Sequence, residues 1–301
     1  MKDSKGLVFD IERFAVHDGS GIRTTIFLKG CPLSCKWCQN PEGMAPSQSL
    51  VWQKSQCIRC RLCESSDSVT WKKDRPHFAK DIDPEEAARL VDLCPGGAIA
   101  LNGTWKSPQD LIAELEKDRP FFREQGGVTF SGGEPFLQAD FLKDSLQLCK
   151  QSGFHTAIET SLSCRLIDLQ VAAENLDEIF FDIKIFDEEK HKELTSVSNR
   201  RILENAAWLL SSRHAPKITV RTPLIPGCTA NDENIAAIAG FLAKHNPNVR
   251  YELLNWNPLA SAKYELAEKD WQLPEKLARF DQAQMEHFRK IAREAGVKTV
   301  L

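Results

Sequence analysis

Cysteine is the residue type that offers most of the possible chemistry in this chain. Ten are present, and seven of them lie between residues 31 and 94. The first three have the spacing C-x3-C-x2-C, the next three have C-x2-C-x2-C, and the last stands before a proline. Thiolates at such spacings bind metal ions or iron–sulfur clusters. We call Cys31, Cys35 and Cys38 the first cysteine set, and Cys57, Cys60, Cys63 and Cys94 the second.

The surroundings of these thiols are expected to be reducing. The N-terminal residues are polar and contain no apolar signal segment, and no apolar run approaches the roughly 20 residues of a membrane span. We therefore expect a cytoplasmic protein, in which clustered cysteines more often bind metals than form disulfides. A net charge of −3 with 42% hydrophobic and 27% charged residues is typical of a globular protein and argues against a broad nucleic-acid-binding face.

The first cysteine set follows a short apolar segment over 23–28 that predicts a buried strand. Its thiols therefore lie on the loop at the C-terminal end of that strand. With a fourth ligand from elsewhere in the chain, they could hold a zinc ion. Without one, they suit a [4Fe–4S] cluster whose remaining iron is free to bind a small chelating molecule.

Short apolar strands alternate with helical patterns along the rest of the chain. Six strands are predicted, over 23–28, 127–130, 155–159, 178–185, 217–224 and 250–254. Helices are predicted from 108, capped by Ser107, and over 142–149, 166–176, 201–210 and 231–245. This alternation indicates βαβ units and a parallel sheet. Six units are too few for a closed eight-stranded barrel, so we predict an α/β fold, a partial (β/α)6 TIM-like barrel with its chemistry at the C-terminal strand ends.

The stretch 51–101 interrupts this alternation. It holds the second cysteine set, a charged run over 72–75 and one short helical pattern that begins at Asp83-Pro84. We therefore predict a small inserted domain over 51–101, with the barrel formed by 1–50 and 102–301.

Polar residues follow the predicted strands. Gly132 and Gly133 come after the second strand and would let a ligand approach the backbone closely, while Glu134 beside them offers a carboxylate to a cation. Glu159 and Asp182 end the third and fourth strands, where a buried carboxylate needs a partner or a bound cation.

Three further residues at strand ends leave alternatives open. Lys184 could meet a ligand carboxylate, or it could form an ordinary ion pair with Asp182. Arg221, at the end of the fifth strand, could face a carboxylate or a sugar, or serve as a structural charge. Asn257 follows the sixth strand and can donate and accept hydrogen bonds, but it cannot titrate.

Three segments together make the chain similar to the radical S-adenosylmethionine (SAM) superfamily. They are Asp18–Arg23, Phe27–Cys31 and Cys35–Glu42. Within that superfamily the chain resembles the glycyl-radical-enzyme activating enzymes, the family of pyruvate formate-lyase activating enzyme. The resemblance covers nearly the whole chain. It implies that the [4Fe–4S] cluster of the first cysteine set binds the amino and carboxylate groups of SAM through its free iron.

The resemblance also implies an activity. An electron from a flavodoxin or ferredoxin reduces the cluster, and SAM is cleaved to methionine and a 5′-deoxyadenosyl radical. That radical takes a hydrogen atom from a backbone glycine of a partner glycyl radical enzyme under anaerobic conditions, and no amino acid acts as an acid or base. One rival interpretation is a radical SAM enzyme that acts on a small molecule. Another is an iron–sulfur electron carrier, which would leave the strand-end motifs without a purpose.

The SAM-binding residues are assigned by the same resemblance. The Gly-Gly-Glu-Pro segment matches the one that holds the methionyl amino group, and the third and fourth strand ends match those that bind a monovalent cation beside the SAM carboxylate. Glu159 stands where the family commonly has Asp, and Asn257 stands where pyruvate formate-lyase activating enzyme has His. Trp37 packs beside the adenine or shields the cluster. The full set is Trp37, Gln39, Asn40, Gly132, Gly133, Glu134, Glu159, Thr160, Asp182, Lys184, Arg221 and Asn257.

The predicted insert resembles bacterial ferredoxin, whose cysteine run is C-x2-C-x2-C-x3-C-P and whose fourth cysteine ligates the other of two clusters. Family members often carry two such runs. Here the fourth position of the first run is Asp67, and the first three positions of the second run are Pro84, Ala87 and Leu90. The four cysteines that are left would make one auxiliary [4Fe–4S] cluster in a ferredoxin-like domain. The alternative is a four-cysteine zinc ribbon.

Overall fold

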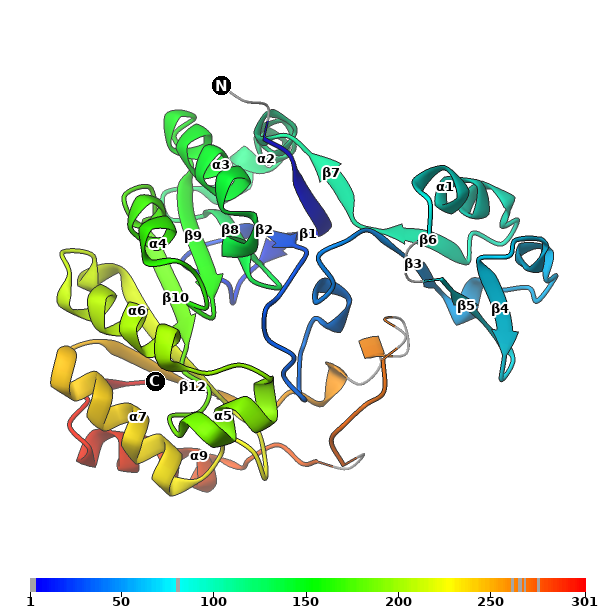
Figure 1. Ribbon diagram of the computed structural model, residues 1–301. Helices are drawn as coiled ribbons and strands as arrows, with labels where there is room; N and C mark the ends of the chain where they lie inside the picture. Colours follow the sequence, from blue (N-terminus) through cyan, green and yellow to red (C-terminus); the bar gives the residue numbers. More distant parts are fainter. Residues whose placement is uncertain (1–3, 80–81, 261–262, 265–266, 268, 275–276) are drawn as a thin grey trace.

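The computed structural model describes residues 4–79, 82–260, 263–264, 267, 269–274 and 277–301. Within these residues, one sheet of nine strands forms the centre of the molecule (Figure 1). Seven neighbouring strands of this sheet run parallel. In sheet order they are β13 (Thr299–Val300), β12 (Arg250–Asn255), β11 (Ile218–Leu224), β10 (Glu178–Asp182), β9 (His155–Thr160), β8 (Gly127–Gly132) and β2 (Arg23–Leu28).

The sheet contains the six strands that the sequence predicts. β2 has the predicted bounds, and four of the others differ by no more than two residues at either end. The exception is β10, which ends at Asp182 rather than at Ile185. Ile183 and Ile185 are buried, and Ile185 packs against the first cysteine set. Ile183 belongs to the main core, so the two side chains are buried in different clusters instead of extending the strand.

Two antiparallel strands that the sequence analysis did not predict extend the sheet beyond β2. β1 (Gly6–Ala15) pairs with β2, and β7 (Thr104–Lys106) pairs with β1. Most of β1 alternates between more and less buried side chains and includes charged residues. It therefore lacks the continuous apolar run by which a strand buried on both faces is recognised.

Helices lie on the outer side of the parallel strands (Figure 1). All but two of them, α5 and α9, are predicted from the sequence. α2 begins at the predicted place because Ser107 and Asp110 form a capping box. The helices are α2 (Pro108–Phe122), α3 (Ala139–Gln151), α4 (Leu166–Ala173), α5 (Glu188–Thr195), α6 (Arg200–Ser211), α7 (Asp232–His245) and α9 (Gln282–Glu294). The chain therefore has an α/β fold with a mostly parallel sheet, consistent with the predicted partial barrel.

The chain between β2 and β7 forms a small lobe that projects from the sheet (Figure 1). Its elements are β3 (Ser49–Trp52), β4 (Val69–Lys72), β5 (Arg75–Phe78), α1 (Pro84–Leu93) and β6 (Ile99–Asn102). β3 pairs with β6 and β4 pairs with β5, both antiparallel. The lobe has its own apolar core, which includes Ala87 and Leu90. These are two of the positions at which a second ferredoxin-like run would have cysteines.

Short 3-10 helices occur in several connections. They are η1 (Pro41–Gly43), η2 (Lys54–Gln56), η3 (Leu62–Ser65), η4 (Pro135–Gln138), η5 (Ala215–Lys217) and η6 (Pro258–Ala260). Among the helices in the described parts of the chain, none combines the length and apolar character needed to cross a membrane.

Arg23, at the start of β2, is fully buried and anchors the segment that precedes this strand. Its Nε donates to Thr129 Oγ1 (2.6 Å) and its Nη2 to the carbonyl of Val128 (2.6 Å), both on β8. Its Nη1 donates to the carbonyl of Ser20 (3.0 Å). Ser20 in turn donates two hydrogen bonds to the carboxylate of Glu178 on β10 (2.9 and 2.5 Å). Burial lowers the pKa of Arg23 to about 10, although Glu178 opposes the shift, so the guanidinium stays charged at neutral pH.

We expect Arg23→Met to destabilise the fold strongly, because it leaves several buried acceptors without a donor. The free energy of unfolding should fall by about 3–5 kcal/mol, as when one partner of a buried charged network is removed. Arg213, an exposed arginine paired with Glu174, provides the control. Arg213→Met should leave the free energy of unfolding nearly unchanged. Denaturant titration under anaerobic conditions measures both, and equal stability of the two variants would contradict the anchoring role.

Candidate functional site

The loop after β2 carries the first cysteine set, as the strand prediction requires. Gly30 N donates to the carbonyl of Gly43 (2.7 Å), which closes the loop against η1. Ser34 N donates to the carbonyl of Thr195 at the end of α5 (2.8 Å). The loop is therefore held by a hydrogen bond between its two ends and by a second hydrogen bond to α5, a helix that the sequence analysis missed.

An apolar cluster surrounds the first cysteine set. Its buried members are Leu33, Cys35, Trp37, Ile185, Ile225, Trp256 and Leu273. Burial raises the pKa of Cys31 and of Cys35 to about 12, and the other thiols of the set contribute to the rise. Thiols that interact inside apolar surroundings need positive charge nearby before they can become thiolates, and the irons of a cluster supply it. The three donors therefore fit a [4Fe–4S] cluster. In the described residues, no three His, Cys, Asp or Glu side chains have the geometry of a single-ion site.

Gly132 ends β8 beside β2, and Gly133 follows it and packs directly against the cysteine loop. Gly132 has a φ of +111°, a conformation that favours glycine. Glu134 N donates to the carbonyl of Gly30 (2.7 Å), and a Cβ on Gly133 would lie only 2.1 Å from the oxygen of that carbonyl. The packing of these two loops therefore already requires a residue without a side chain at position 133.

The carboxylate of Glu134 is fully buried, and protein groups donate to both of its oxygens. Oε1 accepts from Thr160 Oγ1 (2.7 Å) and from Phe136 N (3.2 Å). Oε2 accepts from the backbone N–H and the hydroxyl of Ser161 (2.8 and 2.5 Å). These bonds join the end of β8 to the end of β9. The sequence analysis placed Glu134 and Thr160 in the site but missed Ser161 and Phe136 as their partners.

Arg221 on β11 joins two carboxylates, one on β9 and one on β12. Its Nη1 donates to Glu159 Oε1 (2.6 Å) and its Nε to Glu252 Oε2 (2.7 Å). The guanidinium carbon lies 4.1 Å from the centroid of the Phe180 ring, and Ser131 Oγ donates to Glu159 Oε2 (2.7 Å). The contacts of Arg221 thus agree with the alternative that it serves as a structural charge. Glu252 was missed, although its charge within an otherwise apolar strand was a signal.

Asp182 and Lys184 form an ion pair directly after β10. This pair is the ordinary alternative that the sequence analysis considered. Burial opposes the charge of the ammonium, but the Asp182 carboxylate and the thiols of Cys35 and Cys31 raise the pKa of Lys184 above its ordinary value. A positive charge is therefore held beside the first cysteine set.

The segment after β12 lies over the cysteine loop and brings three predicted SAM-binding residues together. Gln39 Nε2 donates to the carbonyl of Asn257 (3.4 Å). The side-chain oxygen of Asn257 accepts from Leu259 N (3.2 Å), and Asn40 Oδ1 accepts from Lys263 Nζ (2.9 Å). The side chains of Asn40 and Asn257 therefore have protein partners at the edge of the site.

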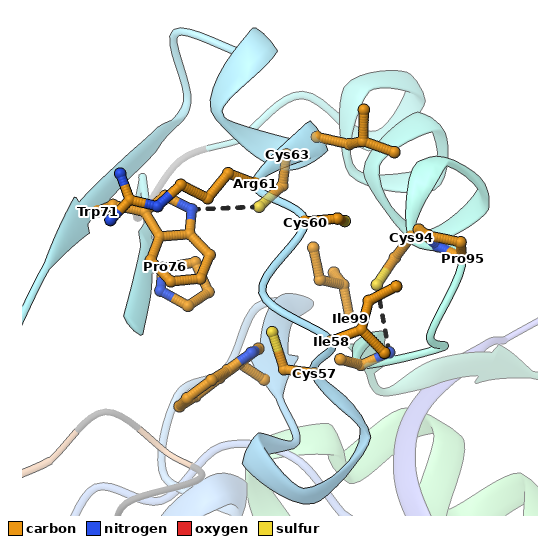
Figure 2. A pocket seen from close by; sticks show the side chains of 13 residues that line it. Cys57, Ile58, Cys60, Arg61, Cys63, Trp71, Pro76, Cys94, Pro95 and Ile99 are labelled. Atoms are coloured by element: carbon orange, nitrogen blue, oxygen red, sulfur yellow. Dashed lines mark hydrogen bonds between the residues drawn. The ribbon is translucent and has the colours of Figure 1, made fainter. Parts of the chain in front are cut away.

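The second cysteine set lines a single pocket in the lobe (Figure 2). Three of its members lie on the chain from the end of η2 into η3, and the fourth directly follows α1. Two N–H groups donate to sulfur there: Trp71 Nε1 to Cys63 Sγ (3.3 Å) and Ala98 N to Cys94 Sγ (3.3 Å). The structure therefore brings together four thiols that are separated by up to 37 residues (94 − 57) in the sequence.

Comparison with known proteins identifies the family. The model of the radical SAM superfamily matches residues 25–239. The indoleacetate decarboxylase activating enzyme of Tractidigestivibacter scatoligenes is 34% identical over 99% of this chain and 97% of that protein. The 4-hydroxyphenylacetate decarboxylase activating enzyme of Clostridioides difficile is 35% identical over 99% and 96%. Among solved structures, a domain of pyruvate-formate lyase-activating enzyme from Bacteroides vulgatus matches 58% of this chain and 98% of that chain, with 28% identity and a TM-score of 0.47.

The chain therefore belongs to the radical SAM superfamily. Within it, the chain is an activating enzyme of the glycyl-radical-enzyme type, because its full-length relatives are activating enzymes. This confirms the family and the class of activity that the motifs predict, and it favours them over a radical SAM enzyme that acts on a small molecule. A [4Fe–4S] cluster and SAM follow from the family.

We expect Gly133→Ala to disturb both the cluster of the first cysteine set and SAM binding, because its Cβ would collide with the carbonyl that precedes Cys31. Iron content after anaerobic reconstitution should fall by up to about four irons, one cluster's share, and SAM affinity by titration calorimetry should fall with it. Gly240→Ala is the control, since nothing lies within 4 Å of a Cβ built there. Normal iron content and affinity in Gly133→Ala would show that the loop can move aside.

Proposed function

We propose that the first cysteine set holds the [4Fe–4S] cluster of this activating enzyme, with SAM bound by the neighbouring strand-end residues. The observation that carries the proposal is that the three cysteines of one loop lie in a single apolar cluster, beside the largely buried ammonium of Lys184. When bound, the reduced cluster supplies the electron that cleaves SAM to methionine and a deoxyadenosyl radical, which takes a hydrogen atom from a glycine. The residues of the chain bind, orient and exclude water.

The predicted residues around the proposed cluster fall into two groups, those that bind SAM and those that hold the surrounding loops. We propose that the backbone at Gly132 and Gly133 receives the methionyl group, that Lys184 meets its carboxylate, and that Asp182 contributes to a monovalent cation site. The other predicted residues are buried or make hydrogen bonds around the cysteine loop and the strand ends, and we assign them to shaping and holding the loops. They are Trp37, Gln39, Asn40, Glu134, Glu159, Thr160, Arg221 and Asn257.

The substrate is proposed to be a backbone glycine of a partner glycyl radical enzyme. The relatives are named as activating enzymes of indoleacetate decarboxylase and 4-hydroxyphenylacetate decarboxylase, which makes a protein substrate the expectation here as well. A flavodoxin or ferredoxin would supply the electron. All ten cysteines are unbridged in the structure, which supports a reducing, cytoplasmic setting.

The second cysteine set is proposed to hold one auxiliary [4Fe–4S] cluster in a ferredoxin-like inserted domain over 51–101. Four thiols around one pocket and two N–H donors to sulfur suit a cluster, whose sulfur atoms commonly accept such bonds. A second auxiliary cluster has no ligands to use, because two positions of the missing run, Ala87 and Leu90, lie in the apolar core of the lobe.

The activation reaction provides the test of function. The protein is reduced anaerobically with SAM and the glycyl radical enzyme encoded beside it. We expect a glycine-centred radical in electron paramagnetic resonance, with one 5′-deoxyadenosine formed per radical. Cys35→Ala should abolish the signal, whereas Cys149→Ala, which removes a buried thiol outside both sets, should keep it. Turnover of a small metabolite without any radical on the partner would contradict the proposed substrate.

Iron content tests the number of clusters. We expect about eight irons per chain after anaerobic reconstitution, from two four-iron clusters. Replacement of the whole first cysteine set by alanine should leave about four irons, and Cys149→Ala should leave all of them. Iron near twelve, roughly three clusters' worth, or zinc bound at the second set would contradict the single auxiliary cluster.

A further inference from the structure

The hydrogen bond from Trp71 to Cys63 is a feature that the family activity does not account for. The indole Nε1 donates to the sulfur over 3.3 Å. Trp71 also lines the pocket that the second cysteine set surrounds, as Figure 2 shows. The bond joins two residues of different elements, since Cys63 lies in η3 and Trp71 on β4.

The hairpin of β4 and β5 presents this indole to the pocket. Lys73 and Asp74 connect the two strands, and both have positive φ values (+49° and +64°). A two-residue turn with both residues in this region is the type I′ turn, which matches the twist of the paired strands. The turn sets Trp71 opposite Pro76, and both side chains line the pocket. The register of the hairpin therefore determines that an N–H donor reaches the sulfur.

Arg61, which lies between Cys60 and Cys63 of the second cysteine set, contacts the same indole. Its guanidinium carbon lies 5.1 Å from the centroid of the Trp71 ring, within the range of a cation–π interaction. Arg61 has a φ of +60°, which is uncommon for a residue with a side chain. The guanidinium thus restrains the ring and brings positive charge close to the second cysteine set.

We propose that Trp71 raises the reduction potential of the cluster held by the second cysteine set, with Arg61 positioning the indole. This inference rests on the auxiliary cluster proposed above. Reduction adds negative charge to a cluster and its sulfur ligands, and an N–H donor stabilises that charge. Hydrogen bonds to sulfur are one of the factors that set cluster potentials. The bond from Ala98 N to Cys94 Sγ acts in the same direction, but it belongs to the backbone and is not removed by a side-chain substitution.

The experiment uses the full chain with the first cysteine set replaced by alanine, so that only the auxiliary cluster is observed. The protein is reconstituted anaerobically with iron and sulfide, and its midpoint potential is measured by redox titration with electron paramagnetic resonance. Trp71→Phe keeps an aromatic ring under Arg61 but loses the donor, so the midpoint potential should become more negative. Trp52→Phe is the matched control. Trp52 lines the same pocket, and its buried Nε1 has no hydrogen-bond partner within the described part of the chain, so the potential should not change.

Each outcome separates this inference from the one on which it depends. An unchanged potential in Trp71→Phe at normal iron content overturns the role of Trp71 but does not contradict the auxiliary cluster. An equal shift in Trp52→Phe also overturns it, because general loosening of the pocket would then explain both. Absence of iron from the parent protein contradicts the auxiliary cluster itself. If Trp71→Phe takes up no iron, Arg61→Lys decides, because it keeps the positive charge but removes the planar guanidinium that restrains the indole: a more negative potential supports the inference, and no shift overturns it.

Discussion

The enclosure of three thiols in an apolar cluster after β2 is the constraint on which the rest of the site depends. Cys35 lies among Trp37, Ile225 and Trp256 and is only 8% exposed. A thiol in such surroundings resists ionisation, yet the thiolate is the form that binds metal. In the proposed cluster, the charge of iron and the nearby ammonium of Lys184 would therefore stabilise the thiolates together. The same apolar residues would keep water away from the radical, since a protein orients its cofactor and excludes competing reactions.

The acidic residues at the strand ends illustrate a second consequence of burial. Glu134 follows β8, and Glu159 lies near the end of the neighbouring strand β9. Protein donors form hydrogen bonds with both carboxylates. An unpaired carboxylate at the fully buried position of Glu134 would cost several kcal/mol of desolvation. The hydroxyls of Thr160 and Ser131 and the guanidinium of Arg221 are therefore what allows acids to stand at this edge of the sheet. The acids then act by fixing the loops that surround the proposed SAM site.

The two cysteine sets differ in their access to solvent. In the first, Cys35 is buried and the other two are partly buried, whereas in the second Cys60 is exposed and the other three members are partly buried. Solvent exposure and hydrogen bonds to sulfur both change the potential of a cluster. Two clusters of one type on a single chain would thus have different potentials, and the lobe would be the more accessible of the two to another protein.

The sequence by itself determined the short buried strands, the capped start of α2 and the spacing of the cysteines within each run, because each depends on residues that are close together in the chain. The six buried strands are visible as short apolar runs, and β1 was missed because it is half exposed and charged. Only the tertiary structure decided the partners of the polar groups. Arg221 reaches Glu159 across 62 positions, and Trp71 reaches Cys63 because a hairpin turn sets its register. Such contacts follow from the order of strands in a sheet and from the packing of loops, and the spacing of residues along the chain does not encode them locally.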